Sequence, residues 1–166
     1  MTLFVKEEVL EADMLRIFKK YGFSLTKSSK RIEDVEIKKG VVTKIQVTSN
    51  PESREVGFLL LVCPHAVAED ISVDFFKMDR NALGIEDLKG CVSELINMIG
   101  GNLQNSLENA SLDMPVLIEE EAQLIKIQEN IEKSDFFYEV AFVNNKAKLL
   151  HLTLYSDTMK QEKRLG

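Results

Sequence analysis

The sequence predicts an α+β fold in which one mainly antiparallel sheet carries long helices packed on one face. Two observations lead to this prediction. Apolar residues recur with helical spacing over residues 6–20 and 85–108, and each of these stretches is followed by strand-like segments. The order of a helix and three strands therefore occurs twice, as a pseudo-two-fold repeat. With 166 residues, 45% of them apolar, residues 1–166 are expected to form a single domain with a substantial core.

The first half of the chain predicts one helix and three strands. The apolar stripe of the first helix consists of Val9, Leu10, Met14, Ile17 and Phe18, and Gly22 supplies its stop. Strand-like sequence follows at Val35 and Ile37, then over residues 41–47, where Val41, Thr43, Ile45 and Val47 share one face. Residues 56–63 are nearly all apolar, which is typical of a strand that is covered on both faces.

The second half predicts two helices and three further strands. Pro64 ends the apolar strand, a connecting helix is expected over residues 65–78, and the long helix over 85–108. Strand signals then cover residues 115–127, 136–143 and 147–155, and Asn144-Asn145 favours a tight hairpin between the last two. The acidic run at 119–121 falls in the first of these strands, where a solvated edge is favoured over a cation site.

The composition limits the function classes. A net charge of −6 without a basic stripe argues against nucleic-acid binding. The longest apolar run, residues 58–63, is too short to cross a bilayer, and charges at residues 6–8 exclude a signal-peptide start, so a cytoplasmic protein is expected. Cys63 and Cys91 match no metal-site spacing and are expected to be reduced core thiols. No metal site is predicted.

The solvent side of the long helix is unusual. It carries Gly90, Glu94, Asn97, Gly101, Gln104, Asn105 and Glu108. Each glycine costs about 1 kcal/mol relative to alanine in a helix, so a glycine-rich exposed face suggests that another molecule approaches closely. Glu94 and Asn97 are nearly one turn apart and project from one patch. A carboxylate that binds a cation, beside an amide that can hold a water molecule, is a plausible hydrolytic pair.

This helix resembles the signature segment of the CheC/CheX family of chemotaxis phosphatases, and it is closest to the CheX branch. The matching residues are Glu94, Leu95, Asn97, Met98, Ile99, Gly101 and Asn102, with Pro115 opening a later strand. The resemblance implies that the chain hydrolyses the aspartyl phosphate of a CheY-like response regulator in bacterial chemotaxis or two-component signalling. Only one copy of the motif is present, which implies one site per chain.

The resemblance also assigns roles to the residues. Glu94 and Asn97 would be catalytic: Glu94 would contact the lysine of the regulator's phosphorylation site, and Asn97 would hold the attacking water. Gly90, Gly101, Gln104 and Asn105 on the same face are assigned to partner binding. The chain would need no cofactor of its own, since Mg²⁺ is expected in the phosphorylated receiver. A homodimer is also implied.

Two alternatives stay open. The family pattern has Asp or Ser at the position of Gly90, which is compatible with a non-catalytic CheX-like module that docks a receiver domain. A small-molecule sensor is a further possibility, although the sequence offers no convergent polar pocket.

Overall fold

The computed structural model describes residues 7–26, 40–49, 55–106, 110–134, 137–144 and 149–156. The helices of this part of the chain are α1 (Glu7–Phe18), η1 (Lys19–Tyr21), α3 (His65–Phe76), η2 (Arg80–Ala82), α4 (Ile85–Ser106) and α5 (Glu121–Glu132). The strands are β1 (Phe23–Thr26), β2 (Gly40–Ser49), β3 (Glu55–Pro64), β4 (Ser111–Leu112), β5 (Val116–Leu117), β6 (Phe137–Asn144) and β7 (Leu149–Ser156).

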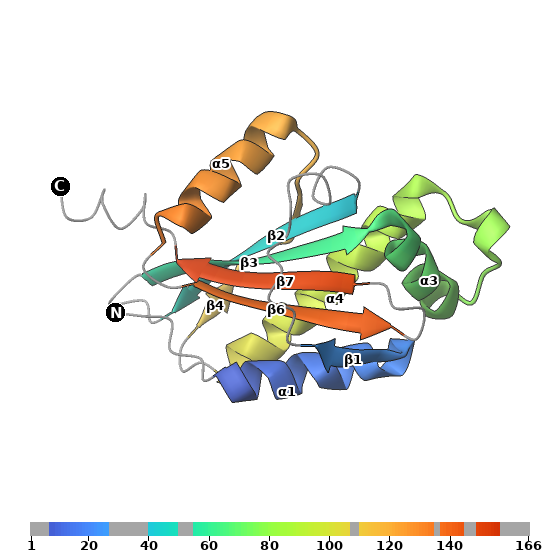
Figure 1. Ribbon diagram of the computed structural model, residues 1–166, viewed down its shortest axis with the longest axis horizontal. Helices are drawn as coiled ribbons and strands as arrows, with labels where there is room; N and C mark the ends of the chain where they lie inside the picture. Colours follow the sequence, from blue (N-terminus) through green and yellow to red (C-terminus); the bar gives the residue numbers. More distant parts are fainter. Residues whose placement is uncertain are drawn as a thin grey trace.

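All these strands belong to one antiparallel sheet (Figure 1). Its order is β1-β6-β7-β3-β2-β4, and β5 also pairs with β2. The longest pairing joins β2 to β3 over their whole length, from Gly40 opposite Pro64 to Ser49 opposite Glu55. The predicted α+β fold with one mainly antiparallel sheet is confirmed.

Helices α1, α3 and α4 cover one face of the sheet, as predicted. Their buried side chains form one core with the inward residues of β2 and β3, including Ile45, Leu59 and Leu61. Within this core α4 packs against α1 and α3 and crosses β2 and β3. Gly22 ends η1 with a φ of 79°, a left-handed conformation that favours glycine, so the predicted stop after the first helix is confirmed.

Helix α5 lies on the opposite face (Figure 1). Its residues Leu124 and Ile127 are buried against Phe58, Leu60 and Tyr155, whose side chains point away from the first core. Strand β3 is consequently buried on both faces, which confirms the prediction for residues 56–63.

The predicted strand over residues 115–127 is wrong except at β5. Glu120 accepts a hydrogen bond from the backbone of Gln123, and the Gln123 side chain accepts one from the backbone of Glu120. This capping box starts α5, so the acidic run begins a helix and does not form a solvated strand edge. The reason is that apolar residues at 124, 127 and 131 follow the helical spacing.

Most other predicted elements are confirmed within two or three residues of their expected ends. They are α1, β2, β3, α3, α4, β6 and β7. Strand β1 was not predicted. Three predicted features lie outside the described residues: the strand signal at Val35 and Ile37, Glu108 at the end of the long helix, and Asn145 in the hairpin. None of the described helices combines the length and apolar character needed to span a bilayer.

Candidate functional site

Helix α4 presents two sharply different faces. Its inner face consists of Leu88, Val92, Leu95, Ile96, Ile99 and Leu103, each at most 2% exposed. Its outer face carries the exposed residues Gly90, Glu94, Asn97, Gln104 and Asn105, while Gly101 is half-buried. Burying one aliphatic side chain contributes about 1.5–3 kcal/mol, so the inner face fixes the rotation of the helix. That rotation holds Glu94 and Asn97 on the solvent side.

The side chains of Glu94 and Asn97 are both exposed to solvent. Within the described part of the chain neither side chain has a hydrogen bond or ion pair with another residue. They lie in adjacent turns of a continuous 22-residue helix, so they project from the same surface. Their polar atoms are therefore available to a molecule that docks on this face.

The two glycines of the outer face leave open space. A Cβ atom built at Gly90 or at Gly101 would have no heavy atom within 4 Å. Internal packing thus does not require glycine at either position. Gly100 differs, because a Cβ there would lie 3.2 Å from Cδ1 of Leu112 and 3.4 Å from Cδ1 of Ile45. Only Gly100 has a reason within the fold, namely the close approach of α4 to the sheet edge.

Gln104 and Asn105 are not equivalent. Gln104 donates a hydrogen bond from Nε2 to the backbone oxygen of Ala110 at 3.0 Å, which joins the end of α4 to the start of β4. Asn105 is exposed and lies beside it. Gln104 is thus already used in fixing the chain after α4, a role that sequence reasoning missed.

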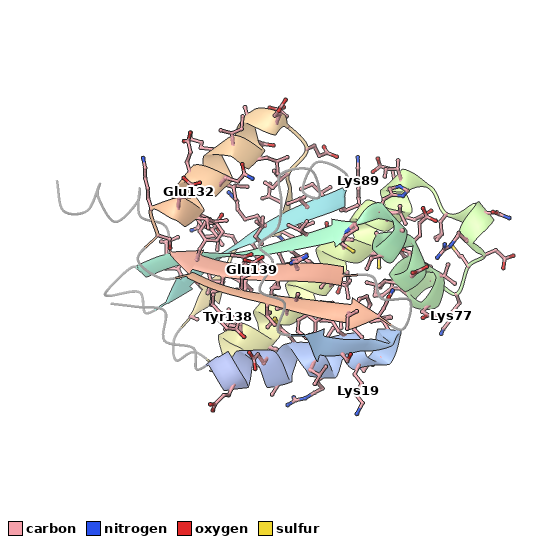
Figure 2. All side chains as sticks on the ribbon, viewed as in Figure 1. Lys19, Lys77, Lys89, Glu132, Tyr138 and Glu139 are labelled. Atoms are coloured by element: carbon pink, nitrogen blue, oxygen red, sulfur yellow. The ribbon has the colours of Figure 1, made fainter. Side chains whose placement is uncertain are left out.

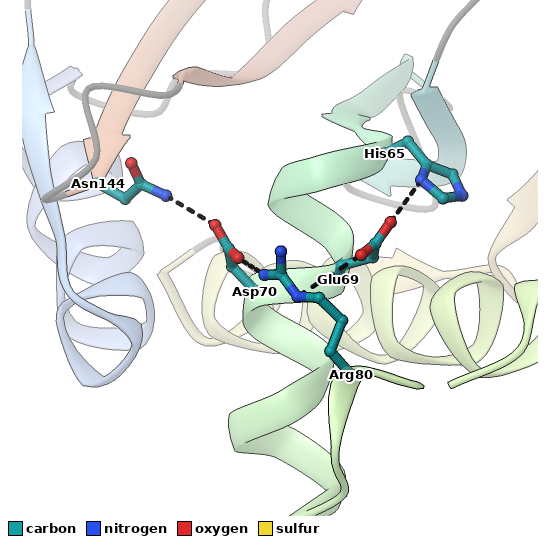
Figure 3. Close-up of polar contacts among 5 residues, drawn as sticks. All are labelled: His65, Glu69, Asp70, Arg80 and Asn144. Carbon is teal, nitrogen blue, oxygen red and sulfur yellow. Dashed lines mark hydrogen bonds and ion pairs between the residues drawn. The ribbon is translucent and has the colours of Figure 1, made fainter. Parts of the chain in front are cut away.

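A polar network fixes the connection that leads into α4 (Figure 3). Arg80 in η2 pairs with Asp70 and, at 3.6 Å, with Glu69 of α3. Asp70 also accepts a hydrogen bond from Asn144 at the end of β6, at 3.5 Å. His65 Nδ1 lies 2.9 Å from Glu69 at the start of the same helix.

This network ties the loop before α4 to α3 and to the sheet. It supports the N-terminal end of α4, which begins five residues before Gly90. No sequence pattern pointed to the link between α3 and β6, because Asp70 and Asn144 are 74 positions apart in the chain.

The described residues contain no cluster of three or more His, Cys, Asp or Glu side chains that could hold a metal ion. Cys63 and Cys91 are free and buried, and burial raises the pKa of both thiols. Both are therefore protonated core groups at neutral pH.

Comparisons with known proteins agree with the sequence resemblance. The family model described as chemotaxis phosphatase CheX matches residues 46–139, which is more than half of the chain. No curated protein sequence matches the chain.

Solved structures share the fold. A chain of the CheX–CheY–BeF3–Mg complex from Borrelia burgdorferi has a TM-score of 0.68 at 15% identity, covering 90% of this chain and 96% of that one. Chemotaxis protein CheX from Vibrio vulnificus gives a TM-score of 0.64 at 13% identity, with 90% and 95% covered. A CheC-like protein from Shewanella oneidensis gives 0.63 at 11%, with 90% and 96% covered. The family match and the shared fold together establish that this chain belongs to the chemotaxis phosphatase CheX family.

Proposed function

We propose that this protein hydrolyses the aspartyl phosphate of a CheY-like receiver domain, with Glu94 and Asn97 as its catalytic pair. Membership of a phosphatase family supports the reaction class. The observation that carries the assignment of the pair is their exposure, without side-chain partners in the described residues, on a helix whose opposite face is fully buried.

The chemistry suits these two side chains. In the reaction, the oxygen of a water molecule attacks phosphorus, the bond to the aspartyl oxygen breaks, and aspartate and inorganic phosphate are released. The Asn97 amide can accept a hydrogen bond from the water through its oxygen and donate one to a phosphoryl oxygen through its nitrogen. Glu94 would pair with the receiver's lysine and thereby orient the docked partner. Both contributions are positioning, which dominates phosphoryl transfer.

We propose that this chain supplies no metal ion of its own and that Mg²⁺ and the phosphorylated aspartate are held by the receiver. The presence of CheY, BeF3 and Mg in the Borrelia burgdorferi complex is compatible with this proposal. The glycines at 90 and 101 would let the partner's surface approach the α4 backbone, because nothing fills the space beside them.

We further propose that residues 1–166 act as a single cytoplasmic domain that forms a homodimer. Among the described residues, β1 and the β4–β5 pair form the two edges of the sheet, and we propose that a second copy pairs with one of them. Light scattering of the purified protein would give the mass, and a monomeric mass would contradict the dimer.

A second candidate function is a non-catalytic receiver-binding module. The feature that favours it is Gly90, where the family pattern has Asp or Ser, since a glycine has no side chain to support Glu94 or the docked partner. The two functions differ in one measurable quantity, the rate of phosphate loss from a bound receiver.

The test uses a phosphorylated CheY-like receiver from the source organism, with Mg²⁺, and follows phosphate release. The wild-type chain is expected to accelerate release, and Asn97→Ala to reduce kcat by about 100-fold or more, as for other removed transition-state donors. Circular dichroism and receiver binding should be retained. Binding without acceleration by the wild-type chain would support the module instead.

Glu94 provides a second, separable test. Glu94→Gln keeps the size of the side chain but removes its charge. If Glu94 pairs with the receiver's lysine, KM should rise about 10-fold or more, the loss typical of a charged hydrogen bond. Glu132→Gln on the far end of α5 is the matched control and should leave KM unchanged.

A further inference from the structure

The segment formed by residues 110–119 runs alongside α4 in the opposite direction. Near the end of α4, Gln104 donates a hydrogen bond to the backbone oxygen of Ala110 at 3.0 Å. Near the start of α4, Lys89 lies 2.6 Å from Glu119 (Figure 2 labels Lys89). Later residues of the segment thus contact earlier residues of the helix, and the two are held together near both ends of α4.

A third contact lies between these two, at Gly100. A Cβ atom built at Gly100 would be 3.2 Å from Cδ1 and 3.5 Å from Cδ2 of Leu112, and 3.4 Å from Cδ1 of Ile45. Carbon atoms that are not bonded to each other are best separated by about 3.5–4.0 Å. A methyl group at position 100 would therefore require Leu112 or the helix to move by a few tenths of an ångström.

The neighbours of Gly100 are themselves held in place by the sheet. Leu112 pairs with Val47 of β2, and the next residue, Asp113, donates its backbone N–H to the backbone oxygen of Gln46 at 3.0 Å. Ile45 is fully buried in the core beneath α4. Because the Leu112 backbone and the Ile45 side chain are fixed, an added methyl group would push α4 away from the edge of the sheet.

Gly100 is close to Asn97 along the helix. With a rise of about 1.5 Å per residue, it lies about 4.5 Å further along the axis than Asn97 and about 9 Å further than Glu94. Helix α4 is continuous over 22 residues, and the ion pair of Lys89 holds its other end. A displacement at Gly100 therefore moves the turn that carries Asn97 more than the turn that carries Glu94.

We propose that Gly100 and Leu112 are positioning residues for Asn97. This inference rests on the proposed function. The absence of a side chain at Gly100 lets α4 rest on Leu112, and this contact sets the height of the Asn97 amide above the edge of the sheet. Hydrolysis needs a water molecule held in line with the bond that breaks, and a misplacement of about 1 Å lowers such a rate by about 100-fold.

The main test is Gly100→Ala, assayed with the phosphorylated receiver and Mg²⁺. A displacement smaller than 1 Å should lower kcat by about 10-fold. KM should stay within about twofold of wild type, because Glu94, which pairs with the receiver, is further from the substitution. Calorimetry with a receiver that carries Mg²⁺ and the phosphoryl mimic beryllofluoride should likewise show unchanged affinity, and this readout does not depend on turnover.

A second substitution should rescue the first. Leu112→Val removes both Cδ atoms that the new methyl group would contact, and it keeps a β-branched residue in β4. Gly100→Ala combined with Leu112→Val should therefore recover kcat to within about threefold of wild type, which is the non-additivity expected of residues in contact.

The matched control is Ile127→Val. Ile127 is buried on the opposite face of the sheet, beneath α5. Its substitution should lower the urea midpoint of unfolding and leave both kcat and KM unchanged, because the molecules that remain folded keep the geometry of α4. The control thus separates a loss of stability from a misplaced Asn97.

Leu112→Ala tests the same contact from the other side and serves if circular dichroism shows that Gly100→Ala does not fold. Without the Leu112 side chain, α4 loses its support at Gly100, so kcat should fall while KM is unchanged. Equal kcat values in Leu112→Ala and the wild-type chain would overturn the positioning role.

The outcomes separate the two proposals. A wild-type chain that neither binds nor dephosphorylates the receiver overturns the proposed function and the positioning role together. An active wild-type chain with an unchanged kcat in Gly100→Ala overturns the positioning role alone. A loss of kcat that Leu112→Val does not reverse also overturns it, because the contact with Leu112 would not be the cause.

Discussion

The Nζ atom of Lys89 lies 2.6 Å from Oε1 of Glu119 and joins α4 to the segment that precedes α5. Glu86, one turn earlier in α4, lies 3.5 Å from the same nitrogen. Lys89 and Glu119 are 30 positions apart in the chain, yet their ion pair joins α4 to the end of the segment formed by residues 110–119. The pair therefore links the helix that carries the candidate catalytic residues to the chain that leads into α5.

We expect Lys89→Met or Glu119→Gln to loosen the end of the segment formed by residues 110–119. The Ile118 N–H, which bonds to Val42, should exchange with solvent faster in both variants, because its neighbour Glu119 is no longer held. Amide exchange followed by mass spectrometry or NMR would measure this. Lys126→Met, an exposed lysine on α5, is the control, and unchanged exchange at Ile118 in Lys89→Met would contradict the prediction.

The pH dependence of this contact follows from the pKa of Lys89. Its hydrogen bond with Glu119 raises that pKa above the ordinary value of 10.5. Because the pKa of Lys89 is higher in the folded protein, the contact stabilises the folded state fully at pH values below the ordinary pKa. This stabilisation is lost as the pH rises through the raised pKa. After correction for intrinsic exchange rates, the protection of Ile118 should be the same at pH 7 and pH 9.

The glycines of α4 should separate stability from partner binding. Gly90→Ala and Gly101→Ala should each raise the free energy of unfolding by about 0.5–1 kcal/mol, because the added methyl enters open space and improves helix propensity. Gly100→Ala should gain less or lose stability, since Leu112 and Ile45 would have to move. Urea unfolding monitored by circular dichroism would rank the three.

The same variants test close approach by the receiver. If the partner's surface touches the α4 backbone at Gly101, then Gly101→Ala should raise KM for the phosphorylated receiver several-fold although the protein is more stable. An unchanged KM in this variant would show that the glycine is not needed for docking.

The network around Asp70 should contribute to folding stability. Asp70→Asn removes the charge that pairs with Arg80 and weakens the bond from Asn144, so the free energy of unfolding should fall by about 1 kcal/mol. Asp74→Asn is the matched control, because Asp74 is exposed on the same helix. Equal unfolding midpoints in urea for the two variants would argue against the network.

The two thiols should be unreactive in the native protein. Burial raises the pKa of Cys63 and Cys91 above the ordinary value of 9.0, so both remain protonated at pH 8 and are shielded from reagents. Iodoacetamide should label neither in the native state and both after unfolding in urea. Rapid labelling of the native protein would contradict their placement in the core.

The raised thiol pKa values also predict a loss of stability in alkali. Above pH 9 the unfolded chain releases the thiol protons that the folded chain keeps, which favours unfolding. The urea midpoint should therefore fall above pH 9 for the wild-type chain and fall less for Cys91→Ala.

The elements that were predicted correctly carry their information locally. Periodicity alone predicted three of these elements and the faces that they bury. They are the apolar stripe of α4, the period-two pattern of β2 and the continuous apolar run of β3. The same helical periodicity also predicted which residues of α4 face the solvent. Helix α5 was missed because the strand signal over residues 115–127 was extended past Glu120, where a capping box with Gln123 starts the helix in the structure.

The sequence by itself determined that α4 is amphipathic and that Glu94 and Asn97 share its polar side, because helical periodicity is a property of the local chain. Only the tertiary structure decided what lies next to that side. The antiparallel path of residues 110–119, the use of Gln104 as a tether and the exposure of Met114 all depend on contacts between distant residues. Such contacts arise when the whole sheet buries its apolar faces, and no local pattern encodes them.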